Sequence, residues 1–167
     1  FTEALYGDFE ETLINIDKTE NISIHLPDYL PGNKLIDPIS RDSDVKKISQ
    51  MLINRVISLA TKIEDKISKK TNIIGSFSKC HNRDRLTNLD EIFEYIDSLN
   101  RTILPQWLPV YAWYFGGSVK LKLFNSIEDI NYLTSNNLKI CLDVSHLVMS
   151  ACHYNVDWKL WYEKLLP

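Results

Sequence analysis

The chain has 167 residues, a formal net charge of -3 and a hydrophobic fraction of 44%. These values are typical of one soluble globular domain, and the acidic balance argues against a nucleic-acid partner. No apolar run approaches the roughly 20 residues that cross a bilayer, so we expect no membrane contact. The three cysteines are widely spaced and form no Cys-x-x-Cys pair, which predicts reduced thiols and a cytoplasmic location.

Strand and helix patterns alternate along the chain. Short apolar runs predict strands at residues 1–7, 21–26, 72–78, 101–108 and 138–142. Amphipathic spacing predicts helices at residues 8–17, 44–68, 88–99 (with 90 as the alternative start), 127–133 and 157–166. This order is typical of an α/β protein with a parallel sheet wrapped by helices.

Two architectures fit this order, a doubly wound open sheet and part of a (β/α)8 TIM barrel. A nucleotide-binding doubly wound sheet normally carries an early glycine-rich turn between strand and helix, and Gly116-Gly117 lacks that context. The barrel is therefore favoured. A full barrel takes about 250 residues, and five strands alone would leave two exposed edges. We expect residues 1–167 to be a single domain, the interior part of a longer barrel.

Four polar side chains follow the predicted strands at their carboxyl ends: His25, Gln106, Asp143 and His146. In a parallel barrel such positions converge on one face, where the chemistry of these folds collects. An Asp-x-x-His pair there can hold a divalent cation or a substrate hydroxyl beside one. The alternative for the pair is an aspartate that caps a helix and a histidine bonded to nearby backbone.

An aromatic loop follows the predicted strand at 101–108, with Trp107, Trp113 and Tyr114 among its members. Aromatic faces stack on the apolar faces of sugar rings, so these three side chains are candidates for substrate binding. The alternatives are a local hydrophobic cluster that anchors the loop and a contact between the subunits of a homodimer.

Three short motifs resemble those of one known family. They are His25-Leu-Pro, the segment Leu104-Pro-Gln-Trp-Leu-Pro109, and Leu142-Asp-Val-Ser-His146. Together with the strand order, they resemble the xylose-isomerase-like TIM barrels, which include sugar-phosphate isomerases and epimerases and the endonuclease IV type of apurinic-site nuclease. The resemblance implies that the predicted strands are the second to sixth of eight.

The resemblance implies a divalent metal (Mn, Co, Mg or Zn) at the barrel mouth. Asp143 matches the family's aspartate ligand, and Gln106 stands where the family has a glutamate ligand. His146 matches a histidine that contacts substrate or a further metal, and His25 matches one that serves the multi-metal nucleases. The remaining family ligands would lie after Pro167.

Two departures from the family pattern limit the chemistry. Gln106 can offer a neutral oxygen to a metal but cannot act as a general base. The fourth-strand histidine of the family is missing, because Gly75, Ser76 and Phe77 occupy that place. A nuclease-type metal cluster is therefore not expected.

The sequence favours a sugar or sugar-phosphate isomerase or epimerase that moves a proton with the help of a metal. We expect His146 and His25 in catalytic roles and Asp143 and Gln106 at the metal. The general base would come from outside the segment or from Glu3. One alternative is a degenerate barrel that binds a carbohydrate or a partner protein without turnover, either with a bound metal or with none. Another is a metal-independent lyase that would use Lys79.

Overall fold

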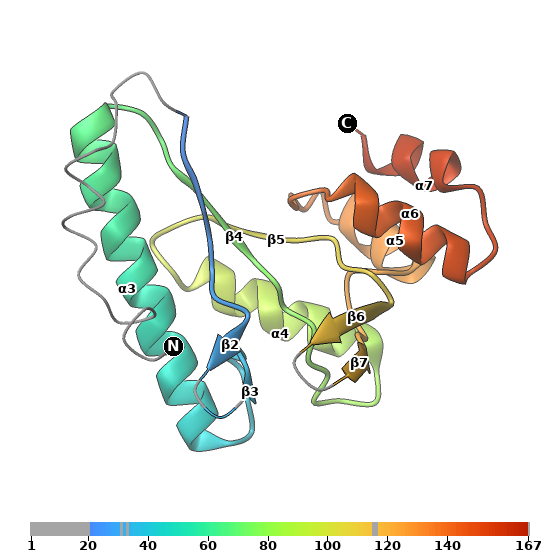
Figure 1. The fold of residues 1–167 in the computed structure, drawn as a ribbon, viewed down its shortest axis with the longest axis horizontal. Coiled ribbons are helices and arrows are strands. Elements are labelled where there is room, and N and C mark those ends of the chain that lie inside the picture. Colours follow the sequence, from blue (N-terminus) through green and yellow to red (C-terminus); the bar gives the residue numbers. More distant parts are fainter. Residues whose placement is uncertain (1–20, 31, 33, 115–116, 167) are drawn as a thin grey trace.

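The computed structural model describes residues 21–30, 32, 34–114 and 117–166 (Figure 1). The strand and helix predicted within residues 1–17, and Glu3 with them, lie outside the described residues. The described chain is a mixed α/β structure in which short strands alternate with longer helices.

Three strands form a parallel sheet whose order follows the chain. β1 (Ser23–His25), β4 (Asn72–Gly75) and β5 (Ile103–Pro105) are hydrogen-bonded in the order β1-β4-β5. A parallel bridge between Gln106 and Cys141 adds a fourth segment beyond β5. Successive segments are therefore neighbours that run in the same direction, and their carboxyl ends lie along one edge. Among the described residues the sheet stays open and does not close into a barrel.

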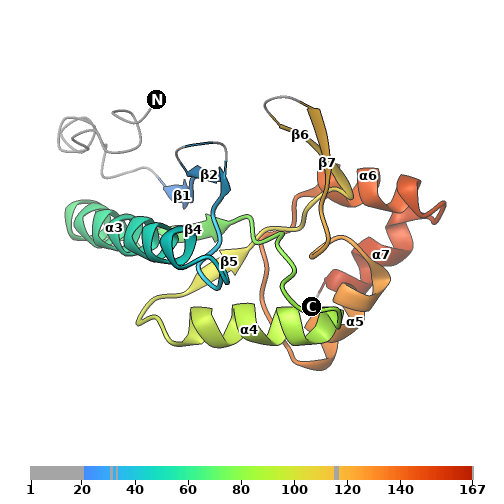
Figure 2. The same ribbon diagram turned by 90° about the horizontal axis from the view of Figure 1, so that it is seen from below.

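The segments between these strands are helical. α3 (Ser43–Ile67) connects β1 to β4, α4 (Arg85–Asp97) connects β4 to β5, and α5 (Ile127–Ser135) precedes the Cys141 bridge. α6 (Val144–His153) and α7 (Trp158–Leu165) follow. Figure 2 shows α5, α6 and α7 gathered at one end of the molecule and α3 at the other. Each of these helices is preceded by an N-cap residue whose side chain accepts hydrogen bonds from backbone N–H groups of the first turn. The N-cap residues of α3 to α7 are, in order, Asp42, Asp84, Ser126, Asp143 and Asp157.

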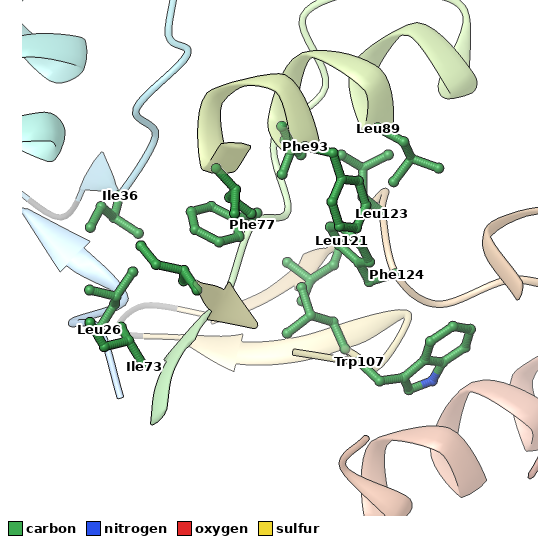
Figure 3. Packing of buried hydrophobic residues seen from close by; sticks show 14 of the residues in the cluster. Leu26, Ile36, Ile73, Phe77, Leu89, Phe93, Trp107, Leu121, Leu123 and Phe124 are labelled. Atoms are coloured by element: carbon green, nitrogen blue, oxygen red, sulfur yellow. The ribbon is translucent and has the colours of Figure 1, made fainter. Parts of the chain in front are cut away.

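The hydrophobic core lies between the sheet, α4 and residues 121–124 (Figure 3). Ile73 in the central strand and Leu89 on α4 are both fully buried. Phe93 on α4 meets Phe124 edge to face, with 6.1 Å between ring centroids. Such aromatic contacts stabilise a core beyond the burial of area alone. This packing fixes the strands whose ends carry His25, Gln106 and Asp143.

Two short hairpins follow the strand ends, where the sequence predicted only loops. β2 (Tyr29–Leu30) pairs with β3 (Lys34–Leu35), and β6 (Tyr111–Tyr114) pairs with β7 (Gly117–Lys120), both antiparallel. Gly32 in the first turn has φ of 79°, a left-handed conformation that glycine adopts without steric cost. Both hairpins lie toward the lower edge of the view in Figure 1.

Helix α6 and the segment before it differ from the prediction. The apolar spacing does not mark a helix at residues 144–153, but the alternative in which Asp143 caps a helix is confirmed, because Val144–His153 is helical with Leu147 and Ala151 buried. The apolar run at 138–142 predicts a strand covered on both faces. It forms only the single bridge at Cys141, and residues 140–142 are half-buried. No described strand pairs with the outer side of this segment, so it lacks the second neighbour that would extend it.

Gly75 is a position where we expect even a methyl group to destabilise the fold. A Cβ atom built there would lie 2.8 Å from Leu26 Cδ1 and 2.8 Å from Phe77 Cε2. Leu26 and Phe77 are both buried in the core and have little room to move. We predict that Gly75→Ala lowers the free energy of unfolding by about 1–3 kcal/mol, measured by urea denaturation. A loss below about 0.5 kcal/mol, typical of a surface substitution, would contradict this packing.

Candidate functional site

Polar side chains from each segment of the sheet meet at its carboxyl edge. His25 is the last residue of β1, Ser76 directly follows β4, and Gln106 directly follows β5. Asp143 comes two residues after the Cys141 bridge and His146 lies in the first turn of α6. The parallel pairing places these chain positions side by side although they are far apart in sequence.

Gln106 is the centre of a continuous line of polar contacts. Its Oε1 lies 2.7 Å from His25 Nε2 and accepts a hydrogen bond from Ser76 Oγ at 3.3 Å. Its Nε2 donates to Asp143 Oδ2 at 3.1 Å. The structure therefore brings His25, Gln106 and Asp143 together, as the sequence predicted from their places at strand ends. Ser76 is a member that the sequence analysis did not select, because a lone serine after a strand carries no distinctive signal.

Asp143 uses its two carboxylate oxygens differently. Oδ1 caps α6 by accepting from Ser145 N at 3.0 Å and His146 N at 3.2 Å, and it also accepts from the Ser145 hydroxyl. Oδ2 faces Gln106 and His146. Partial burial raises the pKa of this carboxyl, but the hydrogen bonds from Ser145 and His146 outweigh it and hold the pKa below its usual value. Asp143 is therefore a carboxylate at neutral pH.

His146 has a defined tautomer when neutral. Its Nδ1 lies 3.1 Å from the Trp107 carbonyl oxygen and 3.4 Å from Asp143 Oδ2. Because both neighbours are acceptors, the proton belongs on Nδ1. The Nε2 atom then carries a lone pair, which can accept a hydrogen bond from a sugar hydroxyl or bind a metal. Orientation of a histidine by a backbone carbonyl or carboxylate is the usual arrangement around metal ligands.

His25 is placed between two oxygen atoms. Its Nδ1 lies 2.6 Å from the Leu26 carbonyl, and its Nε2 faces Gln106 Oε1. Both contacts are hydrogen bonds when the ring carries two protons. When a neutral ring carries its proton on Nδ1, the Gln106 amide has to be turned so that its NH2 group donates to Nε2, and this is possible because the two ends of an amide have nearly the same shape. In the turned arrangement the amide oxygen would face Asp143 Oδ2 across the 3.1 Å contact, where a bound cation would relieve the repulsion between the two oxygens.

The side chains in this line are of types that divalent cations accept as ligands. Asp143 and Gln106 supply oxygen atoms and the two histidines supply imidazole nitrogen, the ligand types that Mg²⁺, Mn²⁺, Co²⁺ and Zn²⁺ accept. The side chains of Asp143 and His146 are 28% and 29% exposed, so ions and small solutes can reach them. The described residues contain no group of three or more His, Cys, Asp or Glu side chains placed to share one ion. The amide of Gln106 is therefore needed to complete even a three-ligand set.

Comparisons with known protein families, curated proteins and solved structures found no match to this chain. The arrangement of side chains along the sheet edge is thus the basis on which a function can be inferred. A search of the described residues also found no helix with the length and apolar character needed to span a bilayer.

The aromatic residues predicted to bind substrate lie in different environments. Trp107 corrects the prediction: its indole is 0% exposed and packs edge to face on Trp161, with 6.0 Å between ring centroids, so it has no free face for a sugar. Figure 3 shows it directed toward the C-terminal helices. Trp113 on β6 is 82% exposed and remains available for stacking. Tyr114 ends β6, and its side chain lies outside the described residues.

Proposed function

We propose that the chain belongs to a sugar isomerase or epimerase that moves a proton on a small carbohydrate. The observation that carries the proposal is the line from His25 through Gln106 to Asp143, with His146 beside it, along the carboxyl edge of adjacent parallel strands. Parallel α/β folds place their chemistry at this edge. A small polyol offers the alternating hydroxyl and carbonyl oxygens that such a line of donors and acceptors can bind.

The strand order supports a (β/α)8 barrel as the complete architecture. In a barrel every strand pairs with the next one along the chain, whereas a doubly wound sheet reverses its order at a switch point. The order β1-β4-β5 followed by the Cys141 segment contains no reversal. The hairpins β2–β3 and β6–β7 then correspond to loops over the barrel mouth, where substrates of barrel enzymes bind.

Each side chain would have its own part in the reaction. Asp143 and Gln106 would hold a divalent cation, which when bound supplies Lewis-acid polarisation of a substrate carbonyl. His146 would accept a hydrogen bond from a substrate hydroxyl at Nε2, and His25 would bind a second oxygen. A general base outside the described residues would take the proton from the carbon next to the carbonyl and return it to a neighbouring carbon or to the opposite face. Trp113 on the exposed hairpin would stack on the sugar ring.

Exchange of substrate hydrogen with solvent tests this proposal. The full chain is incubated in D2O with keto pentoses and keto hexoses, both free and phosphorylated, and with Mn²⁺, Co²⁺, Mg²⁺ or Zn²⁺. Deuterium in the recovered sugar is then measured by mass spectrometry. We expect incorporation at the carbon next to the carbonyl with at least one sugar and none with Asp143→Asn. A complete lack of exchange across the panel would contradict an isomerase or epimerase.

The second candidate is a barrel that binds a carbohydrate without turnover. The amide of Gln106 favours it, because an amide cannot accept a proton as the glutamate of the resembled family can. Gln106 also pairs with both of its neighbours, which leaves the line of side chains stable without a substrate. Sugar binding without deuterium exchange would support this candidate.

Gln106→Glu distinguishes the two candidates further. The new carboxylate would lie about 3 Å from Asp143 Oδ2, in the place of the amide nitrogen. Without metal we expect repulsion to lower the free energy of unfolding by about 1–3 kcal/mol. With Mn²⁺ we expect at least about tenfold tighter metal binding than in the wild type and recovery of the lost stability. Unchanged Mn²⁺ affinity, measured by titration calorimetry, would place the ion away from Gln106.

A further inference from the structure

A groove runs beside strand β7 of the second hairpin, which projects from the rest of the molecule in Figure 2. It consists of two pockets with volumes of about 530 Å³ and 170 Å³. The two pockets are continuous, because they share four lining residues, which are Cys80, Lys120, Leu121 and Lys122. Residues 78–83, in the loop after β4, form a second wall. We call this space the β7 groove.

The β7 groove lies along the free edge of β7. All four residues from 119 to 122 line the smaller pocket. Successive side chains of an extended chain point to opposite faces, so a space that all of them line lies along the edge of the strand. The other edge of β7 pairs with β6, and no described residue of β6 lines either pocket. Among the described residues no second strand pairs with β7.

Backbone groups on this edge are open for pairing. Leu121 N donates to the Val110 carbonyl oxygen at 2.8 Å, which continues the antiparallel ladder between β6 and β7. Hydrogen-bonded and non-bonded pairs alternate along such a ladder, so the N–H and C=O groups of Ser118 and Lys120 point away from β6. Within the described part of the chain no backbone hydrogen bond outside the hairpin reaches these groups. Such an edge is a template for an additional strand.

The β7 groove is strongly basic. Lys79, Arg83, Lys120 and Lys122 line it and are exposed, whereas none of its lining residues is a carboxylate. None of these four cations forms an ion pair with another described residue. Leu121 is buried between the exposed Lys120 and Lys122, which places both lysines on one face of the extended chain. The edge therefore carries positive charges two residues apart.

We propose that the β7 groove binds an extended acidic segment of a partner protein, which adds a third strand to the β6–β7 hairpin. Ser118 and Lys120 would supply the backbone hydrogen bonds, and carboxylates at alternate positions of the segment would lie opposite Lys120 and Lys122. A small anion could meet the charges but would leave the edge of the strand unpaired. A second copy of the chain fits less well, because pairing two β7 edges would bring their lysines together. This inference does not depend on the proposed function.

Fluorescence anisotropy with labelled peptides and the full chain tests this inference. The first peptide has about eight residues, a usual strand length, and alternates glutamate with valine. A second peptide has the same composition with all glutamates in one block, which puts neighbouring carboxylates on opposite faces of a strand. We expect the alternating peptide to bind at least about tenfold more tightly than the block peptide. Equal affinity for the two would mean that charge alone is recognised, which would overturn the inference.

Two variants test the lysines and the strand edge separately. Lys120→Gln/Lys122→Gln should weaken binding of the alternating peptide at least about tenfold. Ser118→Pro should also weaken it, because proline removes an outward N–H group without breaking a hydrogen bond to β6. The control for net charge is Lys139→Gln/Lys159→Gln, since both lysines are exposed and neither lines the β7 groove. An equal loss in the control and in the groove variant would contradict a specific site.

Methylated peptides test strand addition without altering the protein. Only alternate N–H groups of an added strand face β7, so methylation of one alternate set should abolish binding while methylation of the other should leave it unchanged. Equal effects of the two sets would overturn strand addition. So would a failure of the alternating peptide to bind, or a dimer of the chain that Ser118→Pro dissociates, because a second copy would then occupy the edge.

Discussion

Replacing Asp143 with asparagine is expected to lower the affinity for Mn²⁺ by at least about 100-fold with little change in stability. Substitution of side chains that merely support metal ligands already costs about 10–100-fold in affinity, and Asp143 is the only carboxylate in the line around Gln106. Asparagine is as good a helix cap as aspartate, so α6 keeps the acceptor that binds Ser145 N and His146 N. Metal content after gentle purification and a Mn²⁺ titration measure the effect.

Asp143→Ala provides the matched comparison. Alanine removes the metal ligand and the cap together, so we expect the same loss of Mn²⁺ affinity with an additional loss of about 1 kcal/mol in unfolding free energy.

The contribution of Asp143 to the free energy of unfolding depends on pH with a defined sign. Because the folded pKa of Asp143 is lowered, its stabilising effect is present above the pKa of the unfolded chain and is lost as the pH falls through the folded value. If the Asp143→Asn variant binds Mn²⁺ as tightly as the wild type does, Asp143 is not a metal ligand.

Asp129→Ala is expected to lower the free energy of unfolding by about 3–5 kcal/mol, the largest stability effect predicted for the chain. Asp129 is 0% exposed and accepts hydrogen bonds from the Arg85 guanidinium through both carboxylate oxygens. It also accepts from the backbone N–H groups of Asn125, at 2.7 Å, and Ser126, at 3.1 Å. Alanine would leave a partly buried cation and two backbone donors without their acceptor.

Glu128→Ala is the control for this substitution. Glu128 is the neighbouring residue on α5, is 70% exposed and lies 3.9 Å from Arg85 Nε. An exposed ion pair of this kind contributes little, so we expect a change within about 0.5 kcal/mol. Urea denaturation of both variants gives the comparison. Equal losses for the two would show that Asp129 does not hold α4 and α5 together.

The alternation of strands and helices was predictable because apolar spacing reports burial directly. The apolar stripe that includes Leu52 and Ile63 predicts a helix at 44–68, and both ends of α3 lie within one residue of that prediction. Leu52 and Ile63 are buried, as the stripe indicates. Convergence of His25, Gln106 and Asp143 followed from the same reasoning, because parallel pairing sets all strand ends on one edge. Their individual contacts required the structure, since the sequence does not give the register between strands.

The remaining features depend on tertiary packing that a sequence pattern does not contain. α6 has only a narrow buried stripe, through Leu147 and Ala151, and a β-branched start that weakens its helical signal. The aromatic neighbours of Trp107 predict a substrate loop, yet Trp161, far later in the chain, packs on its indole. The two interpretations of Asp143, helix cap and site residue, are compatible because each carboxylate oxygen serves one of them.

Nuclear magnetic resonance with Mn²⁺ tests the central claim most directly. The ion broadens the amide signals of nearby residues, so its position is mapped without any assumption about substrate. We predict that substoichiometric Mn²⁺ broadens the amide signals of Ser76, Gln106 and His146 first, and that Asp143→Asn removes this selectivity. Broadening spread evenly over exposed carboxylates, or centred on residues away from the carboxyl edge of the sheet, would contradict a metal-dependent sugar site at these strand ends.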